Sequence, residues 1–140
     1  MLQLVKRGKT MCIFCKIVNK EIPSYQLYED DYVIAILDIS QVTKGHTLII
    51  SKKHYENIME ADPETLHHII ETAQKVGIQL KEKLGANGFN VLNNNGSAAG
   101  QTVNHLHFHI IPRYNENDAI VCEFKESGIK VDEVAKQLGI

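Results

Sequence analysis

The segment NHLHFHIIPR, residues Asn104–Arg113, carries three histidines at every second position, namely His105, His107 and His109. In an extended strand, alternate side chains emerge on one face about 6.6 Å apart, so the three imidazoles would form a row. The apolar residues between them would face the core and hold the strand in place. Imidazole titrates near neutral pH and is also a common metal ligand. The spacing therefore favours a catalytic row, with a metal-binding row and a solvated strand face as alternatives.

One long helix is expected to support this row. Asp62 is suited to the N-cap, Pro63 to the first helical position and Gly85 to the C-terminal stop. Between them runs an apolar stripe with helical spacing. Its members are Leu66, Ile69, Ile70, Ala73, Val76, Leu80 and Leu84.

Short apolar and β-branched runs predict about five strands, and VDEVAKQLGI at the end of the chain predicts a short closing helix. Strands joined by tight loops favour an antiparallel sheet with helices packed on it, an α+β fold. The expected strands lie near Tyr25–Tyr28, Tyr32–Ile39, His46–Ser51, Phe89–Asn94 and Val103–Ile111.

The totals fit one compact domain of 140 residues. A net charge of −2 argues against a broad nucleic-acid-binding face. No apolar run approaches the ~20 residues of a membrane span, and the N-terminus lacks the apolar stretch of a signal peptide. Three cysteines, an odd number, favour a reduced cytoplasm. Residues 1–10 are interpreted as a flexible extension before the domain at residues 11–140.

The motif CIFC, with Cys12 and Cys15, is either a redox pair or half of a zinc site. The redox motif normally follows a strand in a βαβ unit, and no such strand is expected here. A structural zinc needs four ligands, and the sequence also offers His54 and His105.

Three further features have ordinary alternatives. The loop NNNGSAAGQT can turn its backbone N–H groups toward an anion, but it also reads as a hairpin turn. Asp38 closes an apolar strand and is either a hydroxyl acceptor or a turn former. Phe14, Ile17, Leu37 and Ile39 form either an apolar cleft or ordinary core.

Taken together, these motifs resemble the histidine triad (HIT) superfamily, whose signature is H-φ-H-φ-H-φ-φ with φ apolar. All seven positions match in HLHFHII. FCKIVNKEIPS, LDISQVTKGHTLIISKKH and NNNGSAAGQTV are similar to the Hint-like branch, so the resemblance covers most of the chain. One departure is Gln41, where relatives often carry proline.

The resemblance implies hydrolysis of nucleoside 5′-phosphoramidates or related nucleotide conjugates. His107 would attack the α-phosphorus and form a covalent nucleotidyl-histidine, which water resolves to a nucleoside monophosphate. His109 would serve the phosphate and the leaving group, and His46 would line the site. The alternatives are a dinucleoside polyphosphate hydrolase, a nucleotidyl transferase, which the third histidine argues against, and a non-catalytic nucleotide-binding module.

The resemblance also implies binding residues, a cofactor and partners. Asp38 would accept the ribose hydroxyls, and the apolar set around Phe14 would hold a purine base. A structural zinc would be bound by Cys12, Cys15, His54 and His105. The protein is expected to be a cytoplasmic homodimer that binds neither nucleic acid nor membrane. Asn94 and Thr102, and more weakly Ser97 and Gln101, would contact phosphate.

Overall fold

The sheet that carries the histidines is a single antiparallel sheet of five strands. The computed structural model describes residues 12–120 and 122–140, so the predicted extension at residues 1–10 lies outside the described residues. The strand order is β1-β2-β3-β5-β4, which confirms the α+β prediction. The strands are β1 (Gln26–Glu29), β2 (Val33–Leu37), β3 (Thr47–Ser51), β4 (Gly88–Leu92) and β5 (His107–Arg113).

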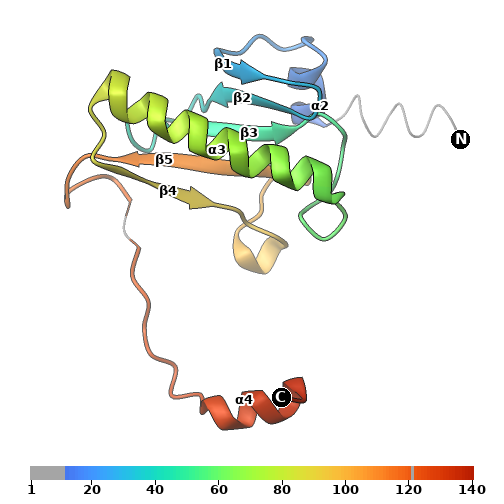
Figure 1. Cartoon of the computed structure of the whole chain (residues 1–140), viewed down its shortest axis with the longest axis vertical. Coiled ribbons are helices and arrows are strands. Elements are labelled where there is room, and N and C mark those ends of the chain that lie inside the picture. The colour runs from blue at the N-terminus through green and yellow to red at the C-terminus, as the bar shows by residue number, and fades with distance from the viewer. Residues whose placement is uncertain (1–11, 121) are drawn as a thin grey trace, which may run out of the picture.

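Helix α3 (Pro63–Leu84) lies across one face of the sheet (Figure 1). Its start is fixed by Asp62, whose Oδ1 accepts a hydrogen bond of 2.8 Å from the Thr65 N–H, and by Pro63 at the first position. It ends at Gly85, whose left-handed backbone has φ 75°. The predicted boundaries are confirmed. Ile70 is the exception in the predicted stripe, because its side chain turns out of the interface and is 57% exposed.

Both faces of the central strands are covered, which explains why β2 is continuously apolar. On the second face lies α2 (Ile13–Val18), a helix that the sequence analysis did not predict. Phe14 and Ile17 of α2 pack there against β2 and β3. The residues packed with α3 are Val33, Ala35, Ile49, Leu106, Phe108 and Ile110.

The strand predicted at Val103–Ile111 begins later than expected, at His107. His105 lies in a bend before the strand. The reason is that the chain turns away to meet the segment after β3, where the Leu106 N–H donates to the Tyr55 carbonyl at 2.8 Å. The three histidines therefore do not share one continuous strand.

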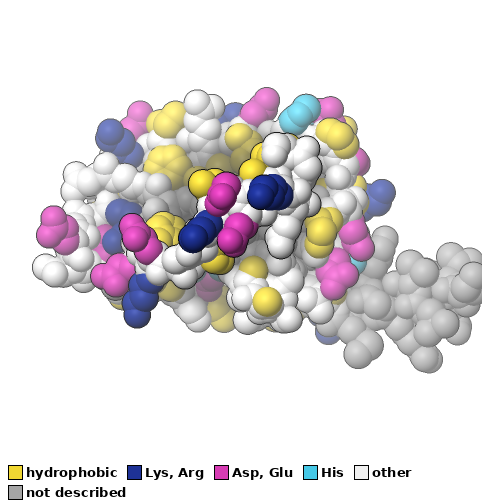
Figure 2. Space-filling view, turned by 90° about the horizontal axis from the view of Figure 1, so that it is seen from below, with side chains coloured by type: hydrophobic (Ala, Val, Ile, Leu, Met, Phe, Trp, Pro, Cys, Tyr) yellow, Lys and Arg dark blue, Asp and Glu magenta, His cyan; other side chains and the backbone are white. Residues whose placement is uncertain are grey.

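The C-terminal helix α4 (Val131–Leu138) is present as predicted, but it does not close the fold. None of its residues is buried, and Figure 1 shows it apart from the sheet at the end of an extended arm. Figure 2 shows acidic and basic side chains interspersed on one face of the molecule. Within the described ranges, no helix is long and apolar enough to cross a membrane.

Candidate active site

His107, the middle histidine, is held as a neutral imidazole with one nitrogen available. Its Nδ1 lies 2.6 Å from the His105 carbonyl oxygen. A carbonyl only accepts, so Nδ1 carries the proton and Nε2 keeps its lone pair. Burial lowers the pKa of His107, which keeps the ring neutral at pH 7. The edge of the Phe14 ring lies against it, with ring centroids 4.9 Å apart. These contacts fix the His107 ring in one orientation.

His109 and His46 meet beside His107. His109 emerges two residues later on β5, and its Nδ1 lies 2.9 Å from His46 Nε2. His46 is buried just before β3, and the ladder that pairs Leu48 with His109 brings the two rings together. Burial, helped by the neighbouring imidazoles, lowers the pKa of His109 to about 4. Three predicted catalytic histidines thus lie in one cluster although one of them is remote in sequence.

Asp38 joins this cluster from the end of β2. Its Oδ2 lies 3.7 Å from His46 Nε2, and its Oδ1 accepts a hydrogen bond of 2.8 Å from the Ser40 N–H. Gln41 holds the loop in this shape, since its amide donates to the Asp38 and His46 carbonyls and accepts from the Gly45 N–H. The residue that departs from the family pattern therefore organises the loop, a role that sequence reasoning missed.

The loop after β4 is tied to the backbone of His107. Asn93 Nδ2 donates to the His107 carbonyl at 2.9 Å, and this contact was not predicted. Gly96 and Gly100 adopt φ of 89° and 90°, which lets the loop fold around the short helix η1 (Ser97–Ala99). Asn94 Nδ2 lies 3.4 Å from the Gly100 carbonyl oxygen, so this contact joins the two ends of the loop.

Gln101 lies beneath this loop rather than at its surface. Its Nε2 donates to the carbonyls of Glu56 and Val103 at 2.6 and 3.0 Å, and its Oε1 accepts from the Gly96 N–H at 2.8 Å. The side chain is buried, so its hydrogen-bonding groups are used within the protein. Of the other predicted phosphate contacts, Ser97 and Thr102 have exposed side chains.

The predicted apolar cleft is brought together only in part. Phe14 and Ile17 are buried on the sheet face that carries His107, and Leu37 is half-buried at the end of β2. Ile39, by contrast, is 99% exposed and packs against none of them. Its position after Asp38 places it beyond the sheet.

Cys12, Cys15, His54 and His105 converge at the other end of the triad. Their ligand atoms lie within 4.8 Å of one another. Three of the sulfur to nitrogen separations are 3.2 to 3.5 Å, and the two Nδ1 atoms are 3.1 Å apart. Tetrahedral zinc with bonds of about 2.0–2.3 Å requires separations of about 3.3–3.6 Å between such atoms. His105 Nε2 donates to the Ser51 carbonyl at 2.7 Å, so its Nδ1 lone pair faces the sulfurs. These residues fit zinc.

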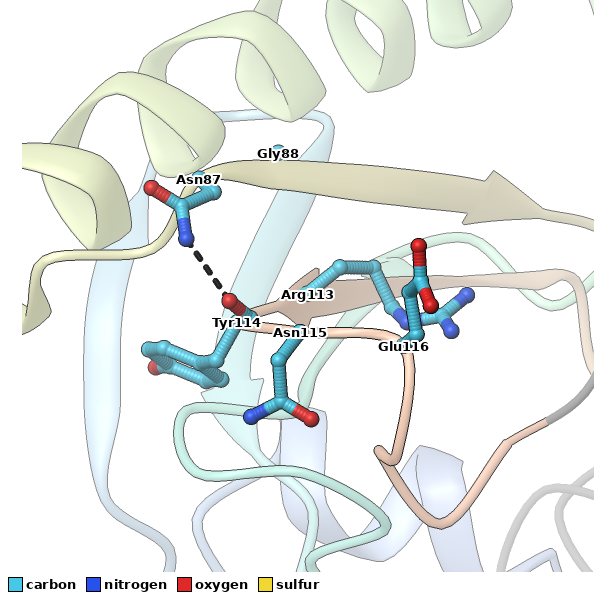
Figure 3. A pocket seen from close by; sticks show the side chains of 6 residues that line it. All are labelled: Asn87, Gly88, Arg113, Tyr114, Asn115 and Glu116. Carbon is cyan, nitrogen blue, oxygen red and sulfur yellow. Dashed lines mark hydrogen bonds between the residues drawn. The ribbon is translucent and has the colours of Figure 1, made fainter.

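A shallow hollow lies at the far end of β5, between Asn87, Gly88 and the segment 113–116 (Figure 3). Arg113 lines it but is already engaged, since its guanidinium donates to Asp118 and to Asn90. Four residues of strand, about 13 Å, separate Arg113 from His109. The hollow is therefore distinct from the histidine cluster.

The comparisons with known proteins show which family the chain belongs to. The HIT domain profile matches residues 19–116, and the chain belongs to the HIT family. An uncharacterized HIT-like protein of Methanocaldococcus jannaschii is 50% identical over 129 residues, 91% of this chain and 98% of its own length. The adenosine 5′-monophosphoramidase of Schizosaccharomyces pombe is 40% identical over 128 residues, 91% of this chain and 92% of its own.

Solved structures show the same fold. A HIT family protein from Bacillus anthracis aligns with a TM-score of 0.84 and 45% identity, covering 91% of this chain and 92% of its own. A Zn-bound histidine triad family protein from Mycobacterium smegmatis aligns with a TM-score of 0.77 and 37% identity, covering 85% and 86% of the two chains.

Proposed function

We propose that this protein hydrolyses nucleoside 5′-phosphoramidates through a covalent intermediate on His107. The observation that carries the proposal is the 2.6 Å hydrogen bond from His107 Nδ1 to the His105 carbonyl. It leaves a neutral Nε2 with its lone pair directed away from the backbone, which is what a nucleophile needs. The name of the Schizosaccharomyces pombe relative supports the substrate class.

The reaction proceeds in two displacements. His107 Nε2 forms a bond to the α-phosphorus while the P–N bond of the substrate breaks, and the departing amine takes up a proton. Water then attacks the same phosphorus, the bond to His107 breaks, and the nucleoside monophosphate leaves. Splitting one hard displacement into two easier ones lowers the barrier.

His109 and His46 supply the proton for the departing amine. When His46 Nδ1 accepts from the Val42 N–H, 3.4 Å away, its Nε2–H donates to His109 Nδ1. The proton of His109 then sits on Nε2. An anionic substrate favours the uptake of one further proton by the His46–His109 pair. His109 can then give its Nε2 proton to the leaving group while both rings return to the neutral state. His46 is thus a positioning residue that sets the tautomer of His109.

The rest of the substrate is bound by the loops around this cluster. Asp38 Oδ2 accepts the ribose hydroxyls, and Phe14, Ile17 and Leu37 hold the purine. Backbone N–H groups of the loop after β4, together with Asn94 and Thr102, bind the phosphate oxygens, with Ser97 at its rim. Gln101 contributes by holding this loop, and Ile39 would contact the base only at its exposed edge.

Cys12, Cys15, His54 and His105 hold a structural zinc in this proposal. Four protein ligands close the coordination sphere, so the ion would stabilise the fold and not activate water. Two ligands lie at the start of α2 and one precedes His107 by two residues, so the ion ties α2 to the nucleophile. The Zn-bound relative from Mycobacterium smegmatis supports a zinc site in this family.

The protein is further proposed to act as a homodimer that pairs β4 with its counterpart. Among the described residues, β4 pairs only with β5, so its outer edge offers open backbone groups. Phe89 and Val91 on this strand are 38% and 46% exposed, and Ile70 and Ile78 of α3 are half-exposed. Such an apolar edge favours association.

The decisive experiment compares wild type and His107→Ala on adenosine 5′-phosphoramidate. Wild type is expected to release AMP, and the variant to lose activity by on the order of 10³-fold or more. Acid-free mass spectrometry during turnover should detect wild-type chain carrying one nucleotidyl group. His67→Ala, which removes an exposed histidine of α3, serves as the control. No turnover by wild type, or full activity of His107→Ala, would refute the mechanism.

A further inference from the structure

Asp38, His46 and His109 form a second group with the geometry of a metal site. One carboxylate oxygen and two imidazole nitrogens lie within 4.8 Å of one another. The two nitrogens are 2.9 Å apart, and Asp38 Oδ2 lies 3.7 Å from His46 Nε2. Ligands of one zinc ion with bonds of about 2.0–2.2 Å sit about 3.3–3.5 Å apart. Side-chain shifts of a few tenths of an ångström would therefore admit an ion.

The backbone of Ser40 orients two of these ligands. Its carbonyl oxygen lies 3.3 Å from His46 Nδ1 and can accept the ring proton, which leaves the Nε2 lone pair available. Its N–H donates to Asp38 Oδ1, which directs Oδ2 toward the imidazoles. Backbone partners of this kind hold the ligands of metal sites in position. His46 Nδ1 can accept from the Val42 N–H or donate to the Ser40 carbonyl. In the second case both imidazoles stay neutral, and an ion can take the place of the hydrogen bond between His46 and His109.

We propose that Asp38, His46 and His109 bind a second divalent cation of the Zn²⁺ or Co²⁺ type. Two imidazoles and one carboxylate suit these ions, and the remaining coordination positions stay open to water. With three protein ligands and no thiolate, this site is weaker than the group formed by Cys12, Cys15, His54 and His105, here called the Cys12 group. None of its residues belongs to that group.

The second ion and a nucleotide exclude each other. This part rests on the proposed function, because the ion occupies the His109 nitrogen and the Asp38 oxygen that the reaction uses. Zinc beyond one equivalent per chain would then act as a reversible inhibitor that competes with substrate.

Binding is tested without reference to activity. Desalted wild-type protein, with its zinc content measured before and after, is titrated with Co²⁺ by calorimetry and visible absorption. One additional Co²⁺ per chain is expected, bound at least about tenfold more weakly in Asp38→Asn and in His109→Gln. His67→Gln, which removes an exposed histidine of α3, should bind Co²⁺ as wild type does. The absence of the additional ion, or unchanged affinity in both site variants, would overturn the proposal.

Competition is tested with AMP and with the hydrolytic assay. AMP should weaken Co²⁺ binding by wild type, and added Zn²⁺ should raise KM while leaving kcat unchanged. If the protein binds the second ion but does not hydrolyse the phosphoramidate, the metal-site proposal stands and the proposed function is wrong. If the protein hydrolyses the phosphoramidate but Zn²⁺ leaves KM unchanged, the claim that the ion and the nucleotide exclude each other is wrong, and the proposed function stands.

Discussion

Gln101 shows how one buried amide can shape a loop. It joins the backbone of residues 56, 96 and 103, which belong to two different loops. Gln101→Ala should lower the free energy of unfolding by about 1–3 kcal/mol, because buried backbone groups lose their partner. It should also weaken AMP binding, since the loop after β4 is no longer held. Chemical denaturation and AMP titration measure the two effects.

The control for this variant is Gln74→Ala, which truncates an exposed glutamine on α3. It should leave both quantities unchanged. If Gln101→Ala bound AMP as tightly as wild type, the loop would not depend on this side chain, and Gln101 would be a stability residue only.

His68 connects α3 to the turn before β2 through Asp30. Its Nδ1 lies 2.8 Å from Asp30 Oδ2, and the ring stacks on Tyr32. The hydrogen bond with Asp30 raises the pKa of His68 above 6.5. Partial burial opposes ionisation of Asp30, but hydrogen bonds from His68 and the backbone outweigh it and lower its pKa to about 2.

The direction of the pH dependence follows from these shifts. The pKa of His68 is higher in the folded chain, so its contribution is complete below pH 6.5 and is lost as pH rises through the raised pKa. The contribution of Asp30 is present above its ordinary pKa of 3.8 and is lost as pH falls from there through about 2. The difference in unfolding free energy between wild type and His68→Gln should therefore shrink from pH 6 to pH 9. A difference that is constant or grows with pH would contradict the assigned ion pair.

At the scale of elements, the proposed association of two chains depends on the open edge of β4. Val91→Asp places a charge on the exposed apolar side of this edge strand, where pairing with a second copy would bury it. The variant should have half the wild-type mass by light scattering, with an unchanged circular dichroism spectrum. Tyr25→Asp, next to the opposite edge strand β1, should keep the wild-type mass. Loss of association in Tyr25→Asp instead would assign the interface to β1.

At the scale of the whole molecule, the Cys12 group joins segments that are distant in the chain. Its ligands come from the start of α2, the loop after β3 and the bend before β5. A bound metal adds its binding free energy to the folded state, about 4 kcal/mol when free zinc exceeds Kd a thousandfold. The double variant Cys12→Ser, Cys15→Ser should therefore lack this zinc and unfold at lower temperature.

Elemental analysis and thermal unfolding with and without a chelator measure these effects. Cys122→Ser is the matched control, because Cys122 is exposed and lies in neither of the ligand groups found among residues 12–120 and 122–140. The control should respond to the chelator as wild type does. Unchanged zinc content in the double variant would remove Cys12 and Cys15 from the ligand set.

The sequence by itself determined the features that depend on near neighbours in the chain. The limits of α3 follow from Asp62, Pro63 and Gly85, whose capping preferences act within one helical turn. The alternation around His107 and His109 follows from the two-residue period of a strand. The motifs also sufficed to predict the HIT family, which the profile match confirms.

Only the tertiary structure decided where distant side chains meet and which polar groups are already used. The pairing of His46 with His109 depends on the register of β3 and β5. Gln101 and Gln41 proved to hold loops because their amides meet backbone groups of other turns. These outcomes depend on long-range packing and hydrogen-bond competition, which spacing along the chain does not encode. For the same reason α4 could be predicted as a helix, but its separation from the sheet could not.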